Sequence, residues 1–181
     1  MRLEELLEKI LAEKGKEMKL YKFEKMADHH RTAVINIFNH YITDSFAAYS
    51  DETVDYDFFD RFLDMTRGYP AVVIKDDRET VVGFAFLHAI RPERTFLRVA
   101  EITYFIHPDH TCKGIGTMVL NQFRQAAQER GIETLLASIS SRNEESLRFH
   151  GKNGFEECGR FRRIGKKFGD DFDMVWMQLD L

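Results

Sequence analysis

This sequence has few cysteines, no long apolar run near its start and no excess of positive charge. Its two cysteines, Cys112 and Cys158, lie far apart in 181 residues and cannot build a small secreted scaffold of paired cysteines. The 26 basic residues are outnumbered by 30 acidic ones, and the formal net charge of -4 gives a field that repels nucleic acid and anionic membranes. We therefore expect a protein of a reducing compartment in which any anion-binding site is local.

The first residues lack an uninterrupted apolar run of the length of a signal peptide or a membrane span, because charged residues interrupt it. We therefore expect a cytoplasmic protein. Apolar residues between positions 3 and 11 fall at helical spacing and predict an amphipathic helix, in an extension over residues 1–18 before a domain over residues 19–181. Packing on its own domain is the expected role of this helix, and a partner or a membrane surface is the alternative, although its glutamates disfavour anionic lipid.

The rest of the chain alternates between strand and helix periodicity. It contains no internal repeat, low-complexity segment or linker, so we predict one α/β domain with a mixed, twisted sheet and helices on both faces. Strands are predicted at residues 19–23, 71–75, 81–88, 100–106, 134–140 and 172–179, and helices around residues 34–41, 58–63, 119–127 and 143–153.

A glycine-containing loop, residues 107–117, joins the strand that ends at Ile106 to the next helix. Its backbone amides can converge on an anion beside the positive end of the helix dipole, and Gly114 and Gly116 let the backbone approach a ligand. Glycines that serve only a tight turn are the alternative. A Walker loop is excluded because no Gly-Lys-Ser/Thr ends the segment, and a dinucleotide fingerprint is excluded because its third glycine is absent.

The segment Thr111-Cys112-Lys113-Gly114-Ile115-Gly116 resembles the coenzyme-binding signature of the GCN5-related N-acetyltransferase (GNAT) superfamily. That signature reads Arg or Gln, two residues, Gly, one residue, then Gly or Ala, and Thr111 departs from it because it lacks the long polar side chain. The resemblance implies that backbone amides cradle the pyrophosphate of coenzyme A while Lys113 supplies a positive charge nearby. The implied coenzyme-binding residues here are Cys112, Lys113, Gly114, Ile115, Gly116 and Thr117.

Two later segments strengthen the resemblance. Residues 143–155 are similar to the family block Asn-x-x-Ser-x-x-x-His-x-x-x-Gly-Phe, and residues 165–178 are similar to the tail of the phosphinothricin acetyltransferase subgroup. The likeness covers residues 20–181. It implies an acetyl-CoA-dependent N-acetyltransferase that acts on the amine of a small molecule, needs no metal, holds acetyl-CoA in a cleft between splayed strands and forms a homodimer.

The resemblance also assigns roles to individual residues. Glu101 matches the subgroup's catalytic glutamate and is expected to act as general base, directly or through water, whereas a strand-end ion pair is the structural alternative. His150, two helical turns after Asn143, is expected in the active site as an acid or a base, or else as a packing residue. The implied coenzyme contacts beyond the loop are the backbone of Tyr104, Phe105 and Ile106, the side chain of Asn143, and Ser146.

The expected substrate side departs from the subgroup. Its usual Arg-x-Ala-Tyr run is replaced by Glu93-Arg94-Thr95-Phe96, and its C-terminal Arg-Trp pair by Asp170-Asp171. Arg94 is the expected partner of an acceptor carboxylate, with Arg91 as the alternative, and Phe96 replaces the tyrosine. We therefore predict a free α-amine acceptor of amino-acid size and poor activity on phosphinothricin.

Three other interpretations remain for comparison. The chain can be a noncatalytic acetyl-CoA-sensing module with the same fold, or an enzyme that acetylates protein N-termini. The cluster His107, His110 and Cys112 superficially suits zinc, but no second ligand group lies at a familiar spacing. His29 and His30 precede a helix, and we expect them to be solvated.

Overall fold

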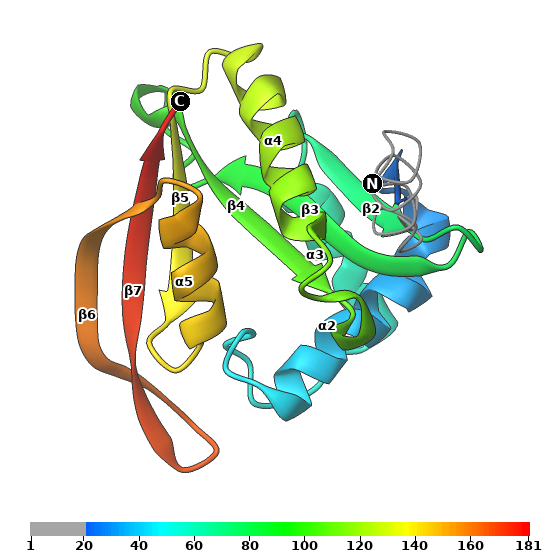
Figure 1. The fold of residues 1–181 in the computed structure, drawn as a ribbon, viewed down its shortest axis with the longest axis horizontal. Helices are drawn as coiled ribbons and strands as arrows, with labels where there is room; N and C mark the ends of the chain where they lie inside the picture. Colours follow the sequence, from blue (N-terminus) through cyan, green and yellow to red (C-terminus); the bar gives the residue numbers. More distant parts are fainter. Residues whose placement is uncertain (1–20) are drawn as a thin grey trace, which may run out of the picture.

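The computed structural model describes residues 21–181 (Figure 1). The helix predicted at residues 3–11 lies outside these residues, as do the first residues of the strand predicted at 19–23, whose described counterpart begins at Lys22. The strands are β1 (Lys22–Lys25), β2 (Ala71–Lys75), β3 (Val81–Ala89), β4 (Val99–Ile106), β5 (Thr134–Ser140), β6 (Glu156–Lys167) and β7 (Asp170–Asp180). The helices are α2 (Arg31–Asp44), α3 (Phe59–Met65), α4 (Ile115–Gln128) and α5 (Glu144–Lys152).

The described strands form one sheet in the order β1-β2-β3-β4-β5-β7-β6. Neighbouring strands are antiparallel except β4 and β5, which run parallel. Short turns join β2 to β3 and β6 to β7, whereas the parallel pair β4 and β5 needs the long crossover through α4. The prediction of one mixed α/β domain is confirmed.

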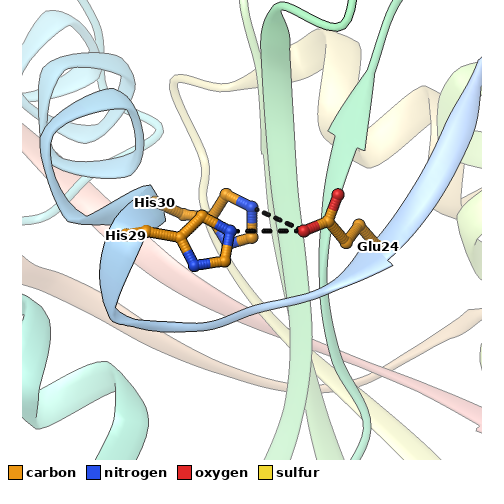
Figure 2. Close-up of side chains that lie close together, drawn as sticks. All are labelled: Glu24, His29 and His30. Carbon is orange, nitrogen blue, oxygen red and sulfur yellow. Dashed lines mark hydrogen bonds and ion pairs between the residues drawn. The ribbon is translucent and has the colours of Figure 1, made fainter.

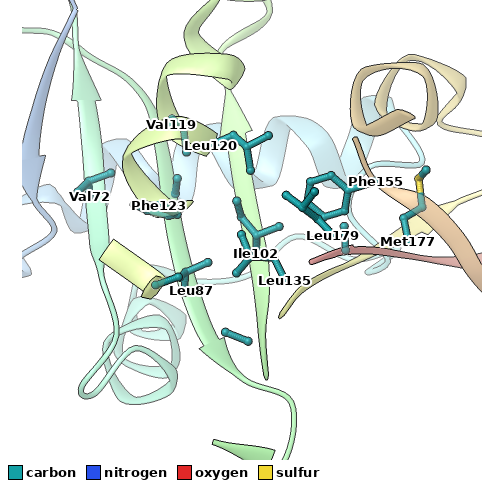
Figure 3. Packing of buried hydrophobic residues seen from close by; sticks show 14 of the residues in the cluster. Val72, Leu87, Ile102, Val119, Leu120, Phe123, Leu135, Phe155, Met177 and Leu179 are labelled. Carbon is teal, nitrogen blue, oxygen red and sulfur yellow. The ribbon is translucent and has the colours of Figure 1, made fainter. Parts of the chain in front are cut away.

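Both faces of the sheet centre are buried, because side chains in a strand alternate between the two faces. Leu87 of β3 packs with Val119 and Phe123 of α4 on one face, in the cluster that Figure 3 shows. Phe84 and Phe86, on the opposite face of β3, pack with residues of α2 and α3. Each such apolar side chain stabilises the fold by roughly 1.5–3 kcal/mol when it leaves water.

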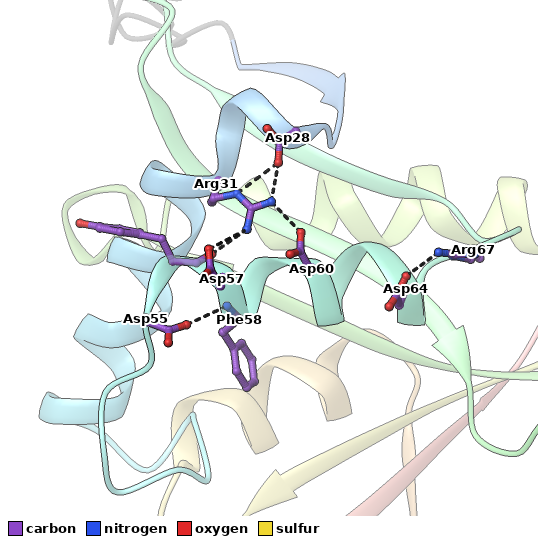
Figure 4. Close-up of polar contacts among 9 residues, drawn as sticks. Asp28, Arg31, Asp55, Asp57, Phe58, Asp60, Asp64 and Arg67 are labelled. Carbon is purple, nitrogen blue, oxygen red and sulfur yellow. Dashed lines mark hydrogen bonds and ion pairs between the residues drawn. The ribbon is translucent and has the colours of Figure 1, made fainter.

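An arginine joins the two helices of the second face. Arg31, at the start of α2, donates to Asp28 at 2.5 Å and to Asp60 of α3 at 2.6 Å, and its guanidinium also donates to the Tyr56 carbonyl at 3.0 Å (Figure 4). A planar guanidinium can serve several acceptors at once. This contact fixes the segment that precedes α3 against α2, and α3 contributes a wall of the site described below.

The sheet splits between its two parallel strands. β4 pairs with β5 only over Val99–Glu101, opposite Thr134–Leu136. Beyond that point β4 stays paired with β3 as far as Ile106, and β5 stays paired with β7 as far as Ser140. The two strands therefore diverge with their facing edges unpaired, as Figure 1 shows, and the expected splay is confirmed.

Strand β6 was not predicted from the sequence. It lies at the edge of the sheet, most of its twelve residues are exposed, and its register with β7 shifts at two places. A strand exposed on both faces carries no alternation of apolar and polar residues, so the usual signal is absent. The closing strand predicted at 172–179 is present as β7.

Candidate active site

Two cavities lie along the split in the sheet. The larger, about 750 Å³, is bordered by the second half of β4, the glycine loop and the start of α5. The smaller, about 320 Å³, is bordered by β4, β5, α3 and residues 47–50. Both cavities share five lining residues, namely Ala47, Tyr104, Phe105, Asn143 and Ser146. A molecule in one cavity can therefore meet a molecule in the other beside these residues.

The glycine loop faces the larger cavity through its backbone. Cys112 and Gly114 both have left-handed backbone conformations, with φ of 57° and 82°, and α4 begins directly afterwards at Ile115. Alternating left-handed residues turn successive amides toward one side, where the helix dipole also favours an anion. Of the residues predicted to hold coenzyme here, the cavity is lined by Cys112, Gly114, Ile115, Gly116 and Thr117.

Lys113 lies differently from the prediction. Its ammonium donates to the backbone carbonyl of Asp109 within the same loop, and Lys113 does not line the cavity. The basic side chains that do line it include Arg142 and Arg148, which flank the start of α5 and which the sequence analysis missed. Their positions beside the Asn143 motif were the available signal.

The reason for glycine at position 116 also differs from the expected one. A β-carbon there would lie 3.0 Å from the ring of Phe149, so the space is taken by α5 rather than reserved for a ligand. At Gly114 a β-carbon would meet nothing within 4 Å, and glycine is favoured by the positive φ instead. Gly116 therefore sets the distance between α4 and α5, which form two walls of the larger cavity.

Glu101 lines the smaller cavity at the last residue pair between β4 and β5. Burial raises the pKa of its carboxyl group to about 7. His88 lies opposite Glu101 on the neighbouring strand β3, with its Nε2 3.8 Å from Glu101 Oε2. Burial lowers the pKa of this imidazole, so the two side chains do not form an ion pair at neutral pH. Glu101 can thus gain or lose a proton near pH 7, as a general base requires.

His150 is buried and uses both ring nitrogens. Its Nδ1 lies 2.7 Å from the Ser146 carbonyl, which can only accept, so Nδ1 carries the proton and Nε2 accepts from the Tyr104 hydroxyl at 2.7 Å. Burial lowers the pKa of His150 to about 4, which keeps the ring neutral. The role of the Tyr104 hydroxyl was not predicted from the sequence, because the family resemblance concerns only the backbone of this residue.

Asn143 has two roles at once. Its side chain caps α5 by accepting from the Ser146 amide at 3.2 Å, and it lines both cavities. Asn143 and His150 both line the smaller cavity, as their spacing of two turns predicted. Phe105 and Ile106 line the larger cavity with Tyr104, and the Tyr41 hydroxyl donates to the Ile106 carbonyl.

The predicted acceptor residues are not brought into either cavity. Arg94 and Phe96 lie in a 3₁₀ turn between β3 and β4, both are exposed, and neither lines a cavity. Arg91, earlier in the same connection, is also exposed and lines neither cavity. Among the residues that line the smaller cavity there is no lysine or arginine. Its apolar walls include Phe38, Phe62, Met65 and Phe86.

One group of possible metal ligands occurs among residues 21–181, and it does not suit a metal (Figure 2). His30 is buried rather than solvated as expected, and its Nδ1 accepts from the Ala27 amide at 3.1 Å. Its Nε2 therefore carries the proton that a metal would have to displace. The carboxylate of Glu24, 3.2 Å from that nitrogen, is also held by Lys75 at 2.5 Å, and His29 is the third member of the group.

Within residues 21–181, none of the helices has the length and apolar character that a membrane span requires.

A split mixed sheet with a glycine loop at a helix start beside the gap is the arrangement that the resemblance to N-acetyltransferases predicted. The family model described as acetyltransferase (GNAT) family matches residues 34–155, and the chain belongs to this family. The L-amino acid N-acyltransferase MnaT of Escherichia coli is 33% identical over 154 residues, which are 82% of this chain and 87% of that protein. An L-methionine sulfoximine/L-methionine sulfone acetyltransferase of Salmonella typhimurium is 31% identical over 82% of this chain and 88% of its own.

Solved structures agree with this assignment. A GNAT superfamily phosphinothricin acetyltransferase from Sinorhizobium meliloti, in complex with acetyl-CoA, superposes with a TM-score of 0.83 at 25% identity, over 89% of this chain and 88% of that one. A ribosomal-protein-alanine N-acetyltransferase from Brucella melitensis gives 0.81 at 28% identity, over 88% and 99%. The predicted family, fold and acetyltransferase class are confirmed.

Proposed function

We propose that this protein transfers the acetyl group of acetyl-CoA to the primary amine of a small molecule of amino-acid size. The observation that carries the proposal is the meeting of two cavities at Tyr104, Asn143 and Ser146, with a carboxyl group of pKa about 7 in the smaller one. A donor and an acceptor can occupy separate cavities and react where these join. The relatives named as amino-acid and methionine sulfoximine acetyltransferases support an acceptor of this size.

The larger cavity is the proposed place of acetyl-CoA. Amides from Cys112 to Thr117 are aimed at its pyrophosphate, and the unpaired edge of β4 at Tyr104–Ile106 is available to the pantetheine arm. Since Lys113 is turned away and Thr111 is short, Arg142 and Arg148 are the proposed source of positive charge. Their guanidinium groups, which also pair with Asp170 and Glu144, attract phosphate groups to this cavity.

Glu101 is the proposed general base in the smaller cavity. It accepts a proton from the acceptor amine, directly or through a water molecule, so that the nitrogen lone pair can attack the thioester carbon. The carbon–sulfur bond then breaks and the coenzyme thiolate takes up a proton. A carboxyl group whose pKa lies near the working pH is suited to this step, and removing such a base costs roughly 10²–10⁴ in rate.

His150 remains in the proposed catalytic set as the partner of Tyr104. Because its Nδ1 is fixed by the Ser146 carbonyl, its Nε2 holds the Tyr104 hydroxyl at the junction of the cavities. Tyr104 is then the side chain that faces both substrates, and His150 acts through it. Tyr104→Phe should therefore reproduce most of the loss in kcat that His150→Phe causes, and the double variant should add little.

The acceptor cavity favours an apolar substrate side chain. Phe38, Phe62 and Phe86 offer aromatic contact, whereas no lysine or arginine lines this cavity to neutralise an anionic group on the acceptor side chain. An acidic group on the acceptor side chain would lose water without gaining a cation. This supports poor turnover of phosphinothricin through the lining of the cavity, which Arg94 and Phe96 do not join.

A screen for thiol release tests the proposed function. Purified protein with acetyl-CoA is offered free amino acids, methionine sulfone, methionine sulfoximine, phosphinothricin and short peptides. Release with free amines supports the proposal, and coenzyme binding without any release would instead indicate the noncatalytic module. Release with peptides alone would favour N-terminal acetylation, the second candidate, which the similarity to the ribosomal-protein-alanine enzyme supports.

The remaining proposals concern the whole chain. By the family resemblance we propose a cytoplasmic homodimer, with residues 1–18 as an extension before the domain at 19–181. Light scattering and activity measurements on the full chain and on a variant that begins at residue 19 would test the homodimer and the extension, since a stable, dimeric and active domain is expected in each case.

A further inference from the structure

Residues 45–50, which we call the strap, cross the split in the sheet. They follow α2, and they contribute walls to both cavities, with Ser45 and Phe46 in the larger, Ala48 in the smaller and Ala47 in both. At the far side of the split, the hydroxyl of Tyr49 lies 2.8 Å from Ser138 Oγ of β5. The strap therefore reaches from the end of α2 to β5, the first strand beyond the split.

A buried lysine forms hydrogen bonds to the backbone of the strap. Lys167, the last residue of β6, has a relative exposure of 2%. Its ammonium donates to the Ser45 carbonyl at 2.8 Å and to the Ala48 carbonyl at 2.7 Å. Ser45 also caps the C-terminal end of α2, where the helix dipole favours a cation.

Lys167 lies next to the tight turn of the hairpin that β6 and β7 form. Phe168 and Gly169 have φ of 53° and 86° and join β6 to β7 as a two-residue turn, directly after the pair Lys167 and Asp170. Rings from the same hairpin pack on the strap, since Phe168 contacts Phe46 with centroids 5.4 Å apart. The ammonium also lies 4.9 Å from the centre of the Phe168 ring.

An ammonium buried without a carboxylate in hydrogen-bonding contact is costly, because burial disfavours its charge and lowers its pKa, against the weaker opposing effect of Asp51. An apolar residue would fill the same space without that cost. Lysine at this position instead gives two charged hydrogen bonds to carbonyls that belong to one short segment. The gain is positional, since the two contacts fix where the strap runs.

We propose that Lys167 is a positioning residue for acetyl transfer, whose ammonium fixes the strap so that the walls of both cavities are formed before the substrates bind. The inference rests on the proposed function, because it assigns the cavities to donor and acceptor. Lys167 touches neither cavity itself. Its loss should therefore weaken substrate binding more than it slows the chemical step.

The test compares Lys167→Met with Lys166→Met, the exposed neighbour on the same strand. Lys167→Met should raise KM for the acceptor by about tenfold, as expected for lost charged hydrogen bonds, while kcat changes less than about threefold. Amide hydrogen exchange in residues 45–50 should accelerate, and exchange in α4 should not. Lys166→Met should match the wild type in all three measurements.

Two results would overturn the inference. One is an unchanged KM and unchanged strap exchange in folded Lys167→Met; the other is a loss confined to kcat. If Lys167→Met does not fold, exchange in the wild type decides: strap amides that exchange as fast as the exposed loop at residues 90–98 would contradict a fixed strap, and marked protection supports it. A wild type that acetylates no amine would refute the proposed function, whereas the exchange measurements would still judge the strap.

Discussion

Glu101 holds its proton more tightly than a carboxyl group in water, because burial disfavours the charged form and raises its pKa to about 7. A base must be ionised to work, so kcat/KM should rise with pH through about 7 and then level off. In Glu101→Gln this rising limb should disappear, and the rate should fall by roughly 10²–10⁴. A pH–rate profile of both proteins checks this. A variant that kept both the limb and the rate would leave Glu101 as an ordinary strand residue.

His150 makes the fold sensitive to acid. Burial lowers its pKa from 6.5 to about 4 in the folded chain, so below pH 6.5 the unfolded chain binds the proton more readily. The stability that comes from neutral His150 is therefore complete above pH 6.5 and is lost as the pH falls toward 4. Urea unfolding at several pH values should show a shallower loss for His150→Gln than for the wild type. His29→Gln, at an exposed histidine, is the control and should keep the wild-type slope.

At the level of secondary-structure elements, the contact between α4 and α5 explains a glycine. A β-carbon at Gly116 would lie 3.0 Å from the Phe149 ring, so Gly116→Ala should push the two helices apart and destabilise the fold by about 1–3 kcal/mol. Adding Phe149→Leu should restore part of that loss, which urea unfolding of the single and double variants measures. Purely additive effects would mean that position 116 needs glycine for another reason.

Elements with strong periodic patterns were predictable, and elements without them were not. The strand predicted at 134–140 has the observed bounds, because alternate residues there are buried against neighbours on both sides. β6 escaped prediction because its exposed edge imposes no pattern on the sequence.

The candidate site divides in the same way. The glycine loop, Glu101 and the Asn143 cap follow from motif and backbone position, which the sequence records directly. Three other features depend on side-chain directions, which only packing decides. These are the hydrogen bond from Lys113 to the Asp109 carbonyl, the position of Arg94 outside both cavities, and the hydrogen bond from Tyr104 to His150.

At the level of the whole molecule, the distribution of charge predicts which acceptors fail. No lysine or arginine lines the smaller cavity, although 26 are present in the chain. Phosphinothricin carries an anionic phosphinate on its side chain, whereas the side chain of methionine sulfone is uncharged and of similar length. The ratio of kcat/KM for the two should favour the sulfone by about tenfold to a hundredfold, the cost of an unmatched charged contact. Equal values would show that charge on the acceptor side chain is matched in some other way.

The short parallel pairing between β4 and β5 joins two halves of the sheet through three residue pairs. A molecule that fills the gap touches both halves at once, and the unfolded chain offers it no such surface. Ligand binding and folding are therefore thermodynamically linked, and a ligand at a hundred times its dissociation constant adds about 2.7 kcal/mol to the free energy of unfolding. Melting curves recorded with a library of acyl-coenzymes and amines should consequently rank the natural ligands of this cleft without any need for turnover.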